Sequence, residues 1–519
     1  NAMDRLEKSE MKSRKESFFL DLRKTINLHL FRANRALPPE EVSSVVGPAD
    51  LNQLFSIFAG LAEEKDEHLR NPSLVLACLG KIEDGLGLAS SIDIDQLLFK
   101  IIDDGVFLTF LDLFKKQKEI LISESRSQNS SEKTNELVEK FLNVFCYFFQ
   151  DSTEIPDPSS LTPLIFDLSD LLTSFNWSVV NGAMLALSSI LFTNPETFTT
   201  ILNAEVLKKA DVAIQKSYEE GTEAFSTIVA SFVKLVCTIL ENEPFIHPEE
   251  YRDHFESFFK LKIQREDLIE PVEAEVILCL ASFINKKPEE ECFWLLKSEN
   301  FPRFFEGISR SAISKEDILA STVYLAANLS ALSSDEFVKF FEFSEFFELV
   351  KLGLKSSYSK VCSDVCVVLS NLSFSDTEYI KRVLRDCELV ENILGLLSQS
   401  QARLFSDLLR MILSILGEGQ LEEVKGFLHS HPEIVDILIE RSDSLSSSED
   451  LEKLLKILQR IFVVGEEFDP EKEKEVNLFT KRVQMNQRLA EKLEALQEHS
   501  SPAVKILTFD LIRDFFELE

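Results

Sequence analysis

The pattern of apolar and polar residues predicts a chain of short amphipathic helices, and it is clearest between Ser363 and Leu397. In the segment Val367–Leu372, apolar residues recur at helical spacing and Asn371 interrupts them. A turn follows, and two further apolar stripes run over residues 379–384 and 390–397. This stretch therefore predicts three consecutive short helices.

The same pattern returns along the chain at a countable interval. Asn328 lies 43 residues before Asn371, and Ser414 lies 43 residues after it. The equivalent earlier positions are Ser282, then Thr238 or Cys237, and then Ser189. Three-helix units that repeat every 40 to 50 residues, as an approximate range, are typical of armadillo and HEAT arrays. One repeat cannot bury its apolar faces alone, so neighbouring repeats must stack.

The predicted fold is therefore all-α: a right-handed α-solenoid of about ten armadillo repeats, preceded by a basic N-terminal arm. We expect the arm at residues 4–35, a linker at 36–50 and the solenoid, with capping helices at its C-terminal end, at 51–519. The composition agrees, because 15 glycines and 16 prolines among 519 residues fit long helical arrays with short turns. The 43 phenylalanines are expected to fill layers between helices.

Charge and cysteine usage exclude several classes of function. The formal net charge of −33 argues against binding a nucleic-acid backbone directly and favours basic partners. The eight cysteines lack paired spacing, which favours buried thiols in a reducing compartment. Without a catalytic set, a phosphate-binding glycine loop or zinc-type spacing, we expect a protein that is not an enzyme and uses no cofactor or metal. We also expect no membrane insertion.

Three stretches resemble importin-α, the armadillo adaptor of nuclear import. The segment Met11–Lys24 resembles its importin-β-binding arm, the repeat from Val367 to Leu397 resembles its armadillo repeats, and Leu493–Phe516 resembles its closing helices. The resemblance implies a transport adaptor that shuttles between cytoplasm and nucleus and carries basic nuclear-localisation peptides in a concave acidic groove. It also implies an arm that binds importin-β through basic residues and one leucine: Arg14, Lys15, Leu22, Arg23, Lys24, Arg32 and Arg35.

In that family, the third helix of each repeat presents a tryptophan and, four residues later, an asparagine that clamps the peptide backbone. Asn328 and Asn371 match the asparagine, whereas Tyr324 and Val367 stand at the tryptophan positions. In other repeats Ser189, Ser282 and Ser414 replace the asparagine. The resemblance thus implies peptide binding mainly near Asn328 and Asn371. An alternative is that both asparagines only bond neighbouring turns or face water.

The partners implied are importin-β, basic cargo proteins and, at the C-terminal repeats, a nuclear export receptor. A second interpretation needs none of them. The chain would then be an armadillo scaffold or assembly chaperone that holds other protein partners and has no role in transport. The two differ in what they require of the arm, because only a transport adaptor must bind importin-β through residues 4–35.

Overall fold

The computed structural model describes most of the chain from Pro72 onward, with short gaps. The described ranges are 72–86, 106–126, 132–151, 158–221, 224–242, 248–264, 272–332, 335–342, 345–375, 377–445, 447–466 and 477–516. Within these ranges every regular element is a helix. The predicted arm at 4–35 and linker at 36–50 lie outside the described residues, so their boundaries stay predictions.

The helices of the first half are listed here with their bounds: α3 (Pro72–Leu86), α5 (Val106–Arg126), α6 (Glu132–Asp151), α7 (Pro158–Leu171), α8 (Trp177–Thr193), η1 (Pro195–Thr197), α9 (Phe198–Asn203), α10 (Val206–Glu219), α11 (Phe225–Asn242), α12 (Pro248–Gln264) and α14 (Glu273–Lys286). The next group is α15 (Glu289–Cys292), α16 (Trp294–Lys297), α17 (Phe301–Ala312), α18 (Glu316–Ser330), η3 (Asp335–Phe341), α19 (Glu345–Lys355) and α20 (Ser359–Ser375). The last group is α21 (Thr377–Arg385), α22 (Cys387–Gln399), α23 (Ala402–Glu418), α24 (Leu421–Ser430), α25 (Ile434–Arg441), η4 (Ser442–Ser444), α26 (Ser448–Glu466), α27 (Leu478–Met485), α28 (Gln487–Ala495), η5 (Leu496–Glu498) and α29 (Pro502–Phe515).

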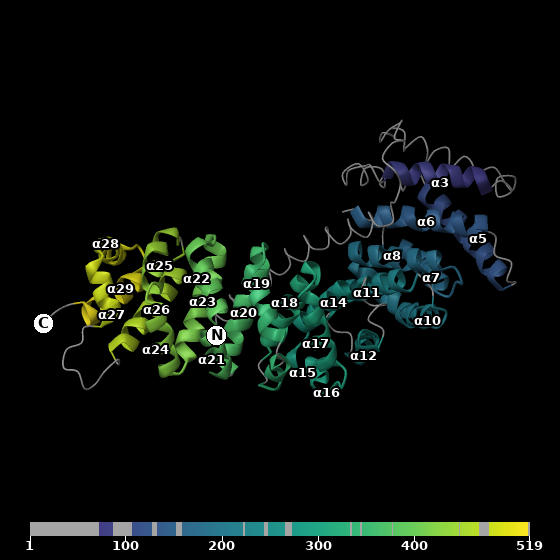
Figure 1. The fold of residues 1–519 in the computed structure, drawn as a ribbon. Coiled ribbons are helices and arrows are strands. Elements are labelled where there is room, and N and C mark those ends of the chain that lie inside the picture. Colours follow the sequence, from purple (N-terminus) through teal and green to yellow (C-terminus); the bar gives the residue numbers. More distant parts are fainter. Residues whose placement is uncertain are drawn as a thin grey trace.

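One helix of each repeat packs against its equivalent in the next repeat, and together these form a continuous row. We call them the ladder helices: α3, α6, α8, α11, α14, α18, α20, α23, α26 and α29. Figure 1 shows the stack advancing in chain order from the purple to the yellow end. A second row of helices runs beside it, formed by α12, α17, α19, α22, α25 and α28. The chain is therefore an all-α solenoid, and the predicted repeat architecture is confirmed.

Phenylalanine side chains fill the layers between helices, as predicted. In the first half, Phe110 of α5 meets Phe141 and Phe145 of α6 with ring centroids 4.8 and 5.3 Å apart. Further along, Phe259 of α12 stacks on Trp294 at 6.2 Å and meets Phe304 of α17 at 4.6 Å. Edge-to-face and offset ring pairs each add about 0.5–1.5 kcal/mol beyond the area they bury. The aromatic layers therefore stabilise the contacts between successive repeats.

Local sequence fixes where helices begin and how closely they pack. Asn176 caps α8, because its side-chain oxygen accepts hydrogen bonds from the backbone N–H groups of Ser178 and Val179 at 2.9 and 3.3 Å. Gly353 of α19 lies against α20, where an added Cβ would stand 2.5 Å from Val365 Cγ2. Only glycine permits that approach, so α19 is held close to its ladder helix.

Candidate functional site

The surface that the sequence singled out runs along the ladder helices through the positions equivalent to Val367 and Asn371 of α20. We call this surface the ladder face. Its register is regular in α20, α23 and α26, where equivalent residues stand 43 positions apart. The rows are Asp364, Asp407 and Asp450; Val367, Arg410 and Lys453; Ser370, Leu413 and Lys456; and Phe374, Gly417 and Arg460. Position in the repeat therefore predicts position on the face.

The two residues of α18 expected to bind peptide are both buried. Tyr324 is 1% exposed and Asn328 is 3% exposed. The amide Nδ2 of Asn328 donates to the backbone carbonyl of Tyr324, one turn earlier in the same helix, at 3.0 Å. Burial raises the pKa of the Tyr324 hydroxyl well above its ordinary value, and a hydrogen bond from Asn328 opposes that rise. These contacts fix both side chains within the helix row.

The equivalent residues of α20 are more accessible. Val367 and Asn371 are half-buried, one turn apart on the same face. Asn371 Nδ2 donates to Ser330 Oγ at the end of α18, at 3.2 Å. This hydrogen bond crosses from one repeat to the next, and the spacing that equated Asn328 with Asn371 therefore places their helices side by side. Asn371 is the better placed of the two asparagines to meet a ligand.

The three serines proposed at the same position are buried. Their exposed fractions are 5% for Ser189, 1% for Ser282 and 6% for Ser414. Ser414 shares a hydrogen bond of 2.8 Å with Ser370 on the neighbouring ladder helix. The three small buried side chains let adjacent ladder helices approach, and Ser414 also links two of them through its hydrogen bond.

Each of the ladder helices α14, α18 and α20 carries a carboxylate in one of its first two turns. Glu275 is half-buried near the start of α14, and Asp317 is exposed near the start of α18. Burial raises the pKa of Glu275, and the negative charge of Asp317 raises it further. Asp364 on α20 is buried and forms an ion pair of 2.6 Å with Lys360. The negative charge of Asp317 therefore makes ionisation of Glu275 less favourable.

A repeating hydrogen bond from serine to aspartate, which was not predicted from the sequence, also joins the ladder helices. Ser363 Oγ donates to Asp407 Oδ2 at 2.5 Å, and one repeat later Ser406 Oγ donates to Asp450 Oδ1 at 2.6 Å. The signal that could have revealed it is the recurrence of a Ser-Asp dipeptide, at 363–364 and 406–407, with a third aspartate at 450. These charge-assisted bonds connect α20 to α23 and α23 to α26.

The resemblance implied an acidic groove, but the ladder face of α23 and α26 also carries basic residues. Four basic side chains there are half-buried or exposed, and they are Arg410, Lys453, Lys456 and Arg460. Acidic residues lie among them, because Asp407 of α23 is half-buried and Glu449 and Asp450 pair with Lys453 at 2.7 and 3.2 Å. The net charge of −33 could not reveal this, because a sum over the chain carries no information on how charges are distributed.

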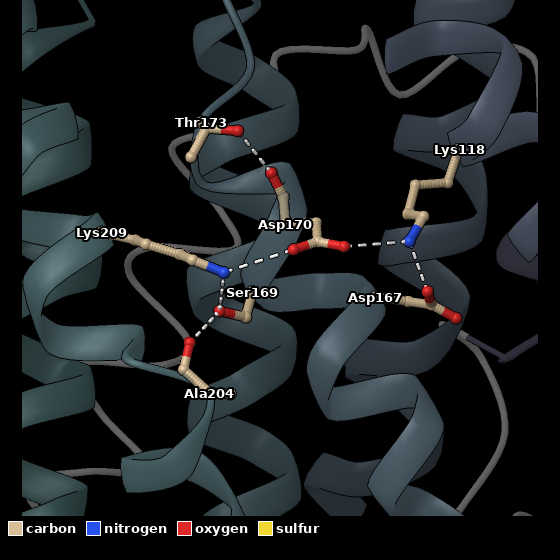
Figure 2. Close-up of polar contacts among 7 residues, drawn as sticks. All are labelled: Lys118, Asp167, Ser169, Asp170, Thr173, Ala204 and Lys209. Carbon is tan, nitrogen blue, oxygen red and sulfur yellow. Dashed lines mark hydrogen bonds and ion pairs between the residues drawn. The ribbon is translucent and has the colours of Figure 1, made fainter. Parts of the chain in front are cut away.

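A separate charged network joins α5, α7 and α10, and Figure 2 shows its members. The ammonium of Lys118 forms ion pairs with Asp167 and with Asp170. Lys209 lies 3.2 Å from Asp170 and 3.0 Å from Ser169, whose own hydroxyl donates to the carbonyl of Ala204 at 2.7 Å. Burial alone would lower the pKa of Lys118, but the two aspartates outweigh it and raise that pKa. With two lysines balancing two aspartates, the network acts as a structural tie.

The cysteines do not form a metal centre in the described part of the chain, where no cluster of three or more candidate ligands occurs. Most are buried as predicted, but Cys387 is exposed and Cys237 is half-buried. Burial raises the pKa of the Cys146 thiol to about 12, which makes it unreactive at neutral pH. Among the helices that the structure describes, none combines the length and apolar character needed to span a bilayer.

Comparisons with known proteins support the fold class but identify no family or function. No family model and no curated protein matches the sequence. Among solved structures, the chain is similar to an engineered protein, target OR497, with a TM-score of 0.63 and 16% identity over 90% of this chain and 100% of that one. It also matches a designed armadillo repeat protein in complex with the peptide (KR)4, with a TM-score of 0.39 and 13% identity over 50% of this chain and 99% of that one.

Proposed function

We propose that this protein is a non-enzymatic adaptor that binds an extended basic peptide on the ladder face between α14 and α20. In its specific form, the proposal is a nuclear import adaptor found in cytoplasm and nucleus. The peptide would be a nuclear-localisation signal, and residues 4–35 would link the complex to importin-β. An export receptor would engage the C-terminal repeats.

The observation that carries the proposal is the position of Glu275 and Asp317 in the first turns of α14 and α18, two ladder helices that pack against each other. Two carboxylates that repel each other are stabilised by a cation bound near both of them. A lysine or arginine of a bound peptide would supply that cation. Asn371 lies on α20, the next ladder helix after α18, where its amide can bond a peptide backbone. A row of charges combined with amide groups suits an extended basic segment.

Peptide affinity tests this role of the asparagines. Replacing Asn328 and Asn371 together with alanine is expected to weaken binding of a lysine-rich nuclear-localisation peptide by at least about tenfold, a loss of about 1.4 kcal/mol. Isothermal calorimetry on the full chain at moderate salt measures it. Asn392→Ala, on α22 outside the ladder helices, is the matched control and should bind as the unaltered protein does. Equal affinity in the double variant would mean that the asparagines only bond their neighbours.

Two observations favour the second candidate, a scaffold that binds other partners. Asn328 is buried against its own helix, and the tryptophan positions hold Tyr324 and Val367. The arm distinguishes the two candidates. Reversing the charges of Arg14, Lys15, Arg23 and Lys24 is expected to abolish binding to importin-β in a pull-down, because the basic arm then loses its attraction to an acidic surface. If the unaltered chain does not bind importin-β, the transport role is wrong and the scaffold remains.

A further inference from the structure

The ladder face on α23 and α26 carries four basic residues beside Asp407 and Asp450. We define the basic patch as Arg410 on α23 together with Lys453, Lys456 and Arg460 on α26. The three residues of α26 are spaced by three and four positions, which puts them on one side of the helix. Because α23 packs against α26, Arg410 lies on the adjoining surface.

Contacts orient the patch across both helices. Arg460 Nε donates to the carbonyl of Leu416 on α23 at 3.1 Å, which anchors its guanidinium at the junction of the two helices. Lys453 is held at the opposite end by Glu449 and Asp450. Lys456 is exposed between them. Arg460, fixed in this way, loses less side-chain entropy on binding an anionic ligand than a mobile surface cation does.

An apolar feature and an open space adjoin the patch. Phe374 on α20 is 64% exposed, although a phenylalanine of this chain is generally buried between helices. One repeat later, Gly417 has nothing within 4 Å of the position that a Cβ would take. Phe374, Gly417 and Arg460 occupy the same position in three successive repeats. The glycine thus leaves room beside the phenylalanine, where a ligand backbone and one apolar side chain can lie.

We propose that the basic patch binds an extended acidic segment of a partner protein. Its carboxylates would pair with Arg410, Lys456 and Arg460, and one apolar side chain would rest on Phe374 above Gly417. Charge complementarity carries the choice of partner, since these cations converge on two adjacent helices in a chain of net charge −33. A nucleic acid fits less well, because a short acidic segment can place its carboxylates at the cations and away from Asp407 and Asp450, whereas a continuous phosphate backbone cannot. This proposal is independent of the basic-peptide site between α14 and α20.

Fluorescence anisotropy with three labelled twelve-residue peptides tests the proposal: one alternating glutamate with leucine, one with glutamine in place of glutamate, and one with lysine. The full chain is expected to bind the glutamate peptide at least tenfold more tightly than the glutamine peptide when the Asn328→Ala and Asn371→Ala substitutions are present. The lysine peptide should bind this variant no better than the glutamine peptide. Equal binding of the glutamate and glutamine peptides would overturn the proposal.

Charge reversal then locates the site. Arg410→Glu with Lys456→Glu should lower affinity for the glutamate peptide at least tenfold, and the milder pair Arg410→Gln with Lys456→Gln should lower it less. Lys208→Glu with Lys297→Glu makes the same change in net charge at exposed positions outside the ladder helices, and it should leave affinity unchanged. Circular dichroism verifies that each variant is folded. Equal losses in the ladder and control pairs, or tighter binding of a single-stranded oligonucleotide than of the glutamate peptide, would overturn the proposal.

Discussion

Replacing Lys262 with methionine is expected to lower the free energy of unfolding by about 3–5 kcal/mol, the usual cost of removing one partner from a buried ion pair. Lys262 on α12 and Glu273 on α14 are 4% and 1% exposed, and Lys262 Nζ lies 2.6 Å from Glu273 Oε1. Lys262 also donates to Ser311 of α17 at 2.9 Å. The substitution would leave a carboxylate in an apolar interior without its counter-charge, which is unfavourable.

The form of the unfolding curve should change as well. In a solenoid each repeat contacts only its neighbours, so a weak junction can separate the array into parts that unfold independently. We therefore expect thermal unfolding of Lys262→Met, followed by circular dichroism, to divide into two transitions. Hydrogen exchange measured by mass spectrometry should show lost protection in α12, α14 and α17 before other helices.

The double variant Lys262→Met with Glu273→Met separates the loss of the pair from the loss of packing. Removing both charges often restores stability, because a buried pair is itself expensive to desolvate. We expect the double variant to unfold close to the unaltered protein and above the single one. If the double variant is less stable than the single one, the unpaired charge of Glu273 is not the main cause of the destabilisation. The packing contacts of Lys262 and Glu273 would then matter more than their ion pair, which would contradict this prediction.

The fold could be predicted from sequence because a constant interval between equivalent residues shows which helices correspond in successive repeats. The interval of 43 residues between Asn328, Asn371 and Ser414 correctly placed α18, α20 and α23 as neighbours. Helical periodicity also put Tyr324 and Asn328 on one side of α18. Periodicity cannot tell how deeply that side is covered, and both residues are buried. The same limit applies to Ser189, Ser282 and Ser414, which link or pack the ladder helices.

The basic residues on the ladder face of α23 and α26 could not be predicted from composition. Their positions could be read from the sequence once the repeats were aligned. Arg410 and Lys453 stand one repeat apart at the position that Val367 and Tyr324 occupy earlier. Aligning the repeats by the asparagine drew attention to that residue and away from the basic residues around it. The partners of Lys262 are harder still, because Glu273 lies on another helix and Ser311 is 49 residues away.

Glu275→Gln is expected to stabilise the protein and weaken peptide binding. The folded-state pKa of Glu275 is raised by burial and by Asp317, so the folded chain holds this proton more tightly than the unfolded chain does. Stability therefore falls as the pH rises from the ordinary pKa of a glutamate through the raised value. Glutamine mimics the protonated acid, and the variant should melt at a higher temperature at pH 7. This difference should disappear below the ordinary pKa, where both states are protonated.

Binding should move in the opposite direction. A lysine of the bound peptide would lower the pKa of Glu275 again, so binding would release a proton and weaken as the pH falls through the raised pKa of the free protein. At pH 7, calorimetry of Glu275→Gln with the lysine-rich peptide should show about a tenfold loss, equivalent to about 1.4 kcal/mol. The pH dependence should be lost with it, and Glu299→Gln, an exposed control outside the ladder helices, should change neither property. A substitution that raises stability and lowers affinity is typical of a binding site, where groups that bind the ligand destabilise the free protein. A variant that is more stable and binds equally well would show instead that the raised pKa of Glu275 has no role in binding. The basic-peptide site would then have to lie elsewhere on the ladder face.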